Sequence, residues 1–461
     1  MQQWKPDIAG AEGPKYLAIA AALTRDIDAG VLQAGARLPT QRVLAKALGV
    51  DLTTVTRAFG EAHRLGLVEG DGRRGSFVRA PRSDAPAIIY SEPADVGMNA
   101  PPEAPGGQLA AAFRRSAERL LGGDHGPAPF QYQPSGGLTL AREAGVKVLS
   151  RRGIPCSDDT VIVAAGGQHA LHAVVSAALQ PGDAVALGSY AYPGMLALAR
   201  RYGLKLVPVA ADEHGLDPDA LNAACHVSPI RAVYVVPTND NPTTTTMDVE
   251  RRHAIARVAR AHDLALIEDD AYGLLREQPL EPLAAIAPEL TWHISSVSKI
   301  LSPGLRVAWL AAPDIGKAWR LAADLYETAV MAPPLNAAIV ADWVASDRFA
   351  ALTGAVREEA LARQGIATEE LRPGSFRAQP EGYHLWVPLD PGMSSGDIAG
   401  ALRSRGLSVV PSDSFAVQRG DAAPALRVSI GGMISREDLR RGLGFLAALI
   451  APDAVHKVTL V

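Results

Sequence analysis

The sequence has few cysteines, few aromatic residues and no long apolar run. Aromatic residues make up 5% of the 461 positions, and the two cysteines, Cys156 and Cys225, form neither a CxxC pair nor a metal-ligand spacing. This usage fits the reducing cytoplasm and predicts no metal site. Apolar runs stay shorter than the roughly eighteen residues of a membrane helix, and the first residues lack the apolar core of a signal peptide. We therefore expect no membrane association.

The composition that remains is that of a globular protein with an uneven charge distribution. Hydrophobic residues make up 48% of the chain and charged residues 20%, and its length predicts two or three domains. The net charge of -4 does not by itself suggest nucleic-acid binding. Residues 31–80, however, carry eight basic and four acidic side chains, a net +4, which leaves -8 for the remainder. A basic module joined to an acidic body is expected when only one part meets phosphates.

Periodicity predicts three helices and a hairpin in the basic module. The helices are expected at residues 16–29, 41–48 and 52–65, with Thr40 and Asp51 at the N-caps of the last two. Val55, Ala58, Phe59 and Ala62 share one face of the third helix and should be core. Two short apolar segments flank the glycine- and arginine-rich residues 70–75, which predicts a hairpin wing.

This module, from Leu38 to Val78, resembles the winged helix-turn-helix of the GntR family. The resemblance implies that the third helix enters the major groove and that the wing reaches phosphate. One departure concerns Asp51 and Leu52, which stand where many members carry Ser-Arg, so the operator sequence cannot be transferred from relatives. The implied DNA-binding residues are Thr40, Arg42, Thr53, Thr54, Thr56, Arg57, Arg73 and Arg74.

We divide the chain into a module at 1–80, a connector at 81–105 and a body at 106–461. The connector is rich in proline, alanine and glycine, which predicts a partly extended spacer. Within the body, a smaller subdomain is expected from about residue 346 to 461.

Four apolar runs in the body end in polar residues. They cover residues 160–165, 232–236, 264–267 and 292–294, and helical segments separate most of them. Such alternation predicts an α/β fold with a mostly parallel sheet. In these sheets the site lies beyond the carboxyl ends of the strands, where the polar residues stand.

These polar residues resemble the site of fold-type I aminotransferases, which bind pyridoxal phosphate. Lys299, in a Ser-x-Ser-Lys segment, resembles the lysine that forms a Schiff base with the cofactor, and Asp269 resembles the partner of its pyridine nitrogen. Arg427 resembles the arginine that binds an effector carboxylate. The other implied cofactor contacts are Gly167, Gln168, Tyr192, Asn241, Tyr272, Ser296, Ser298, Arg306 and, from a partner subunit, Tyr132.

Each of these residues has a structural explanation when taken alone, such as a solvated loop acid for Asp269 or a surface ion pair for Arg427. Their order and spacing together favour the cofactor site. Thr244 departs from the pattern, because it stands where aminotransferases typically have glycine, and its backbone cannot easily adopt a positive φ.

The two resemblances together are typical of MocR-type transcriptional regulators. They imply a homodimer that binds promoter DNA and senses an amine or amino acid through pyridoxal phosphate. Two alternatives remain open: an active aminotransferase that carries a DNA-binding domain, and a repressor whose body serves only for dimerisation.

Overall fold

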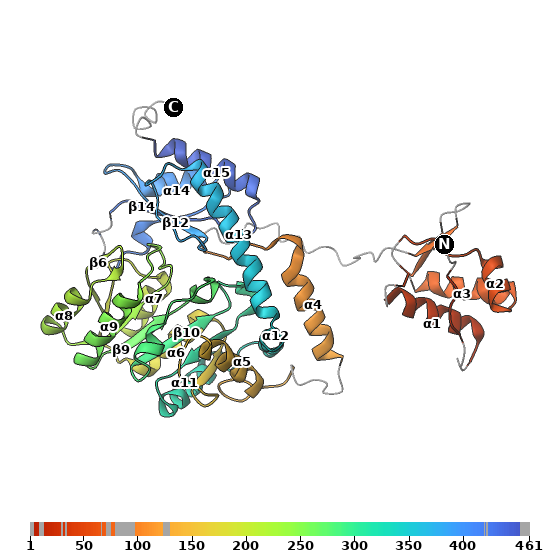
Figure 1. The fold of residues 1–461 in the computed structure, drawn as a ribbon, viewed down its shortest axis with the longest axis horizontal. Coiled ribbons are helices and arrows are strands. Elements are labelled where there is room, and N and C mark those ends of the chain that lie inside the picture. The colour runs from red at the N-terminus through yellow and green to blue at the C-terminus, as the bar shows by residue number, and fades with distance from the viewer. Residues whose placement is uncertain are drawn as a thin grey trace. The chain divides into compact units, whose positions relative to one another are not determined.

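The computed structural model describes two compact units, residues 1–93 and 94–461 (Figure 1). Within them, the described residues are 4–8, 13–28, 31–32, 35–65, 67–70, 75–78, 97–122, 130–418, 420 and 423–451. Arg73 and Arg74 of the predicted wing, and residues 81–96 of the predicted connector, lie outside this set.

Three helices and a two-stranded antiparallel sheet make up the regular structure in the described residues of the first unit. Its elements are α1 (Lys15–Asp28), α2 (Gln41–Leu48), α3 (Leu52–Arg64), β1 (Val68–Gly70) and β2 (Ser76–Val78). The predicted core face of α3, comprising Val55, Ala58, Phe59 and Ala62, is buried against the other elements.

The structure confirms the side-chain N-cap predicted for α2 but not the one predicted for α3. The Thr40 side chain accepts a hydrogen bond from the Val43 amide, as predicted for an N-cap. Asp51 occupies the N-cap position of α3, but its side chain makes no capping hydrogen bond. The first amides of α3 thus receive no side-chain cap from this residue.

A seven-stranded mixed sheet forms the centre of the second unit. Its strand order is β3-β11-β10-β9-β8-β4-β5. Only β11 pairs antiparallel with its neighbours, so the predicted mostly parallel sheet is confirmed. The strands are β3 (Val161–Ala164), β4 (Ala184–Leu187), β5 (Lys205–Pro208), β8 (Ile230–Val235), β9 (Ala265–Asp269), β10 (Thr291–Ser296) and β11 (Ala308–Ala311).

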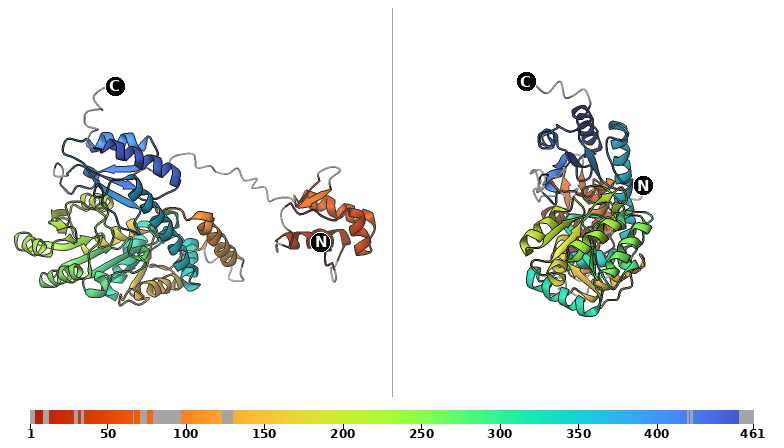
Figure 2. Two further views of the ribbon diagram at one scale, coloured as in Figure 1. Left: turned by 45° about the horizontal axis from the view of Figure 1, so that its top comes forward. Right: turned by 90° about the vertical axis from the view of Figure 1, so that its left-hand side faces the viewer.

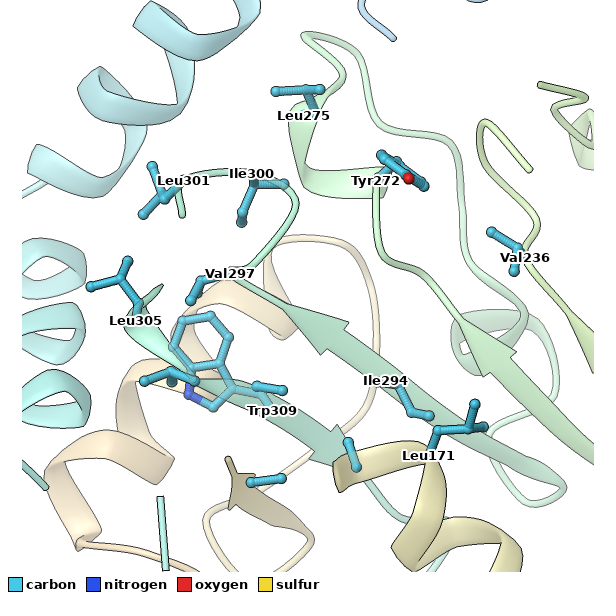
Figure 3. Packing of buried hydrophobic residues seen from close by; sticks show 14 of the residues in the cluster. Leu171, Val236, Tyr272, Leu275, Ile294, Val297, Ile300, Leu301, Leu305 and Trp309 are labelled. Carbon is cyan, nitrogen blue, oxygen red and sulfur yellow. The ribbon is translucent and has the colours of Figure 1, made fainter. Parts of the chain in front are cut away.

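Hydrophobic cores cover both faces of this sheet. Alternate residues of each strand point to opposite sides and so contribute to different cores. Val185 and Leu187 belong to one core, whereas Ala184 and Ala186 belong to the other. The first core includes residues of α5 (Thr139–Ser150), α6 (Gly167–Ala178), α11 (Ile315–Ala329) and α12 (Pro334–Ala345). The ribbons of these helices can be followed by their colour in Figure 2. The second includes residues of α8 (Pro218–Val227), α9 (Val249–Ala261) and α10 (Leu283–Ile286). Figure 3 shows Leu171, Ile294 and Trp309 within the first core.

A smaller antiparallel sheet with three helices follows in the chain, and its separation as a subdomain stays a prediction. The sheet has the order β12-β14-β13. The elements are α13 (Arg348–Glu370), β12 (His384–Pro388), α14 (Ser395–Arg403), β13 (Ser408–Pro411), β14 (Ala425–Ser429) and α15 (Arg436–Leu449). The remaining α-helices and strands in the described part of the body are α4 (Gln108–Leu121), α7 (Pro193–Tyr202) and the hairpin of β6 (Ala211–Asp212) and β7 (Gly215–Leu216).

The end of the predicted connector is part of the body. Residues 97–105 fall in the second unit, and Asn99 is only 2% exposed there. Nothing in the composition of residues 81–105 marks this burial, because a single asparagine in a proline-rich stretch is also typical of an exposed spacer.

Candidate functional site

The polar residues that follow β8, β9 and β10 converge at one edge of the large sheet. These strands are parallel neighbours, so their carboxyl ends meet at the same edge. The charges of Asp269, Arg306 and Arg427 all influence the Lys299 ammonium group. The structure therefore gathers four of the predicted site residues from four separate segments of the chain.

Asp269, the last residue of β9, is held by a tyrosine from the neighbouring strand. The Tyr234 hydroxyl donates to Asp269 Oδ2 over 3.0 Å. Burial raises the pKa of Asp269 to about 6, an effect that the Tyr234 hydrogen bond and the Lys299 charge partly oppose. Sequence reasoning missed Tyr234, although a tyrosine inside a fully buried strand needs a partner for its hydroxyl group.

Lys299 lies in the turn after β10. Its Nζ donates to the Asn99 carbonyl over 2.5 Å, and its own carbonyl accepts from the Tyr383 hydroxyl over 2.7 Å. Burial, together with the positive charge of Arg427, lowers the pKa of Lys299 to about 8. A larger share of neutral amine near neutral pH makes this lysine a better nucleophile than an exposed one.

The start of α6 forms a cradle suited to an anion. Gly166 has a φ of 86°, and a Cβ at this position would lie 2.5 Å from the Arg306 guanidinium, so the arginine lies directly against the backbone. A Cβ on Gly167 would lie 3.3 Å from Ser296 Cβ. Free amides at a helix N-terminus beside an arginine are a ready-made phosphate site.

Two polar atoms in this region are buried without a hydrogen-bond partner among the described residues. They are the Ser298 hydroxyl oxygen and Gln168 Oε1. Buried polar atoms normally have partners, so these two atoms fit a site that is completed by a polar ligand.

Tyr192, Asn241 and Tyr272 lie close to the residues described above: the charges of Asp269 and Arg427 act on both tyrosines, and the Asn241 side chain accepts from Arg427. Burial raises the pKa of Tyr192 and of Tyr272 to about 12, so both hydroxyl groups remain protonated. Asn241, which is 7% exposed, precedes a cis bond to Pro242. Thr244 adopts a φ of 64°, so the turn forms in the left-handed conformation that its side chain disfavours.

Arg427, on β14 of the small domain, faces the same site. Its side chain is buried, with 3% of the residue exposed. Its Nη2 donates to the Gly97 carbonyl over 2.6 Å and its Nη1 to Asn241 Oδ1 over 3.4 Å. The guanidinium also lies over the Phe415 ring, 5.4 Å from its centroid.

Asn99 is the second residue that sequence reasoning missed. Its side-chain amide donates to the Tyr272 hydroxyl over 2.9 Å, and its Oδ1 accepts from the Ser429 hydroxyl over 2.7 Å. The amide nitrogen also lies 3.2 Å from His384 Nδ1. Burial lowers the pKa of His384 to about 3, so this histidine is neutral. Its Nε2 donates to the Asp240 carbonyl over 3.0 Å, which leaves Nδ1 to accept from Asn99.

Tyr132 is not part of this cluster within one chain. It is 84% exposed, and the neighbouring Phe130 is 69% exposed. The backbone amide of Gln133 lies 3.3 Å from Met331 Sδ. The assignment of Tyr132 to a partner subunit's site therefore stays a prediction.

The predicted DNA-binding residues that are described lie on α2 and α3 or just before α2. All are exposed except the half-buried Thr54: Thr40, Arg42, Thr53, Thr54, Thr56 and Arg57. The Thr56 hydroxyl donates to Gln41 Oε1 over 2.8 Å, and the Arg57 guanidinium lies 4.6 Å from the Tyr16 ring centroid. Thr56 and Arg57 thus also have structural contacts, and the DNA-binding role of the set stays a prediction.

The described residues also bear on two other kinds of site. None of the helices in the described part of the chain is long and apolar enough to cross a membrane. Among the same described residues, no group of histidine, cysteine, aspartate or glutamate side chains is arranged to hold a metal ion.

Comparison with known proteins identifies both parts of the chain. Residues 97–446 match the family model of class I and II aminotransferases, and residues 15–78 match that of bacterial regulatory proteins of the gntR family. Members of the aminotransferase family depend on pyridoxal phosphate.

Relatives share both parts. The uncharacterized HTH-type transcriptional regulator YdeF of Bacillus subtilis is 31% identical over 451 residues, which cover 97% of this chain and 96% of that protein. The HTH-type transcriptional regulator TauR of Rhodobacter capsulatus is 26% identical, over 88% and 90% of the two chains. Among solved structures, the α-aminoadipate aminotransferase LysN from Thermus thermophilus has 25% identity and a TM-score of 0.69, and covers 79% of this chain and 93% of its own. The chain belongs to the transcriptional regulators that join a GntR-family DNA-binding domain to a class I and II aminotransferase domain, the MocR type.

Proposed function

We propose that this regulator binds pyridoxal 5'-phosphate and senses an amine or amino acid through it, and that this binding controls its attachment to promoter DNA. The observation that carries the proposal is the convergence of Lys299, Asp269 and the α6 cradle at one edge of the sheet. These groups supply the amine, the carboxylate and the anion site that the cofactor needs.

The residues around Lys299 and Asp269 fit the reactive part of the cofactor. When bound, the cofactor supplies an aldehyde that condenses with amines and a ring that withdraws electrons. Lys299 presents its amine to that aldehyde, and its pKa of about 8 favours the neutral form. Asp269, oriented by Tyr234, offers a carboxylate to the protonated ring nitrogen. Its pKa of about 6 leaves it largely ionised at neutral pH.

The other site residues fix the position of the cofactor. Tyr192 would stack on the ring, while Asn241 and Tyr272 would bind its hydroxyl group. The phosphate would lie at the start of α6, where it would partner buried polar atoms such as the Ser298 hydroxyl oxygen. Its proposed ligands are Gly167, Gln168, Ser296, Ser298, Arg306 and Tyr132 of the partner subunit.

Arg427 is the proposed binding group for an effector carboxylate. Its guanidinium is buried beside the site, where a bidentate ion pair is stronger than at an exposed position. An amino acid would place its amine near Lys299 and its carboxylate on Arg427.

A homodimer is the proposed assembly. An apolar groove of about 1220 Å³ runs along α4 and includes Phe113, Leu301 and Leu352, and at its edge Met433 is 86% exposed. Monomeric proteins seldom leave such large apolar surfaces uncovered, and a second copy would cover this one and bring Tyr132 to its partner's site. The two DNA-binding modules would then bind two half-sites in the cytoplasm.

The alternative of an active aminotransferase rests on the same pocket residues. Lys299, Asp269 and Arg427 are all in place, so the first half of a transamination is compatible with the site. The DNA-binding domain and the relatives named as regulators favour the sensing role. A body that serves only for dimerisation would not need the Asp269–Tyr234 pair.

Absorption spectroscopy of the purified protein tests the cofactor site. We expect a visible band in the wild type that is lost in Lys299→Ala, because this amine forms the covalent link. Lys205→Ala, which removes an exposed lysine on β5, is the matched control and should keep the band. An unchanged spectrum in Lys299→Ala would contradict the assignment.

A further inference from the structure

The end of the predicted connector, which belongs to the body, runs through the proposed effector site. The Gly97 carbonyl accepts from Arg427 Nη2 over 2.6 Å, and the Asn99 carbonyl accepts from Lys299 Nζ over 2.5 Å. Two backbone carbonyls, two residues apart, thus contact the two cations proposed to receive the effector and the cofactor. We refer to residues 97–101 as the site segment.

The site segment is anchored to both domains of the body. The Asn99 side chain contacts Tyr272, at the end of the large sheet, as well as His384 and Ser429 on the small sheet. Further along, the Ala100 carbonyl accepts from the Gly432 amide over 3.0 Å. Any movement of Gly97 is therefore transmitted to Asn99, which joins the two domains.

We propose that an effector carboxylate replaces the Gly97 carbonyl on Arg427 and thereby displaces the site segment, which residues 81–96 of the connector directly precede in the sequence. This inference rests on the proposed function and adds its mechanism of regulation. The effector is then an amino acid, and its carboxylate, rather than its amine, produces the change that reaches the connector.

The competition at Arg427 favours the carboxylate for an electrostatic reason. A carboxylate carries a charge and can accept two parallel N–H bonds from one guanidinium, whereas a backbone carbonyl is a neutral acceptor. Because Arg427 is buried, water screens this difference little. An amine without a carboxylate can react at Lys299 but has nothing with which to replace Gly97.

The backbone geometry prevents the rest of the site segment from staying in place when the Gly97 carbonyl leaves Arg427. Gly97 and Asn99 are separated by about 7 Å of chain at most, so a carbonyl that leaves Arg427 pulls on the Asn99 anchor. Next to the segment, a Cβ on Gly431 would lie 2.0 Å from the Ala100 carbonyl oxygen, so this close packing leaves little room for a partial shift. The segment is therefore expected to move as a unit.

Two stable cofactor adducts that differ only in the carboxylate test the proposal. The full-length apoprotein is loaded with N-(5'-phosphopyridoxyl)-L-alanine or with N-(5'-phosphopyridoxyl)ethylamine, and loading is followed by absorbance. Hydrogen exchange of the peptide that covers Gly432 is then measured, because the Gly432 amide donates to the Ala100 and Pro101 carbonyls of the site segment. We expect about fivefold faster exchange with the alanine adduct, the factor that corresponds to one lost hydrogen bond between neutral groups. The affinity for DNA of the promoter region should also differ at least fivefold between the adducts.

A pair of asparagine variants separates the anchor from general destabilisation. Asn99→Ala removes the side-chain contacts and should bring the exchange with the ethylamine adduct close to that with the alanine adduct. Asn222→Ala, which removes an exposed asparagine on α8 that contacts His262, should leave the difference between the adducts intact. If both adducts bind the wild type but give equal exchange rates, the proposed displacement of the site segment is wrong, whereas the cofactor site is unaffected by this result. Failure of both adducts to bind would overturn the cofactor site and this inference together.

Discussion

Asp269→Asn should make the cofactor-free protein more stable at alkaline pH, because the wild-type carboxylate is held where its charge is disfavoured. Burial raises its pKa from 3.8 to about 6. Such a difference corresponds to about 3 kcal/mol of unfolding free energy. The isosteric amide carries no charge and can still accept the Tyr234 hydrogen bond, so the variant avoids this loss.

The sign and the pH window follow from the direction of the shift. The folded protein binds the Asp269 proton more tightly than the unfolded chain does, so the destabilisation grows as the pH rises from 3.8 to 6 and is complete above pH 6. As the pH falls through 6 towards 3.8 the carboxyl group becomes protonated in the folded state, and the destabilisation disappears. The advantage of Asp269→Asn should be about 3 kcal/mol at pH 8 and about half of that at pH 5.

Urea unfolding of the cofactor-free body, followed by tryptophan fluorescence at both pH values, measures this difference. Asp314→Asn is a control of opposite sign, because the Lys317 side chain lowers the pKa of this exposed carboxyl group. It should bring no gain at pH 8. An Asp269→Asn variant that is no more stable than the wild type at pH 8, or that has the same advantage at both pH values, would refute the reasoning. The same variant should bind the cofactor more weakly, since an amide does not favour a protonated ring nitrogen.

Two further substitutions test the surroundings of the site. Tyr234→Phe removes the donor to Asp269, so the pKa of the Asp269 carboxyl group should rise. Cofactor affinity, measured by titration of the apoprotein, should fall about tenfold at pH 7. Unchanged affinity across pH 6 to 9 would count against a role for Tyr234 in holding Asp269. Thr244→Gly should be more stable in urea than Thr244→Ala by about 1 kcal/mol, because glycine alone relieves the positive φ at this buried position; the ordinary order, with alanine more stable, would argue that no strain is present there.

The parts of the fold with regular periodicity could be predicted from the sequence. The buried face of α3 and the apolar runs of β8, β9 and β10 follow directly from the spacing of hydrophobic residues. The edge at which Asp269 and Lys299 meet follows from parallel strand order. These features depend on local pattern and on a general rule of sheet topology.

The contacts of single polar residues could not be predicted in the same way. Asn99 lies in a stretch whose composition indicates an exposed connector, and its burial depends on partners that are far apart in the chain, Tyr272 and His384. Thr244 was expected to resist a positive φ, yet it adopts one, because the surrounding turn fixes the backbone despite the preference of the side chain. In both cases tertiary contacts outweigh the local preference.

An amino acid that acts through the cofactor on Lys299 should change the affinity of the protein for DNA. The most direct test is fluorescence anisotropy of the full-length, cofactor-loaded protein on DNA of its promoter region. Each common amino acid is titrated in turn, and absorbance reports its reaction at the cofactor. At least one amino acid should change both the spectrum and the DNA affinity of the wild type, and neither should change in Lys299→Ala. If amino acids change the spectrum but none of the set changes the DNA affinity, the proposed coupling between the cofactor site and DNA binding is wrong.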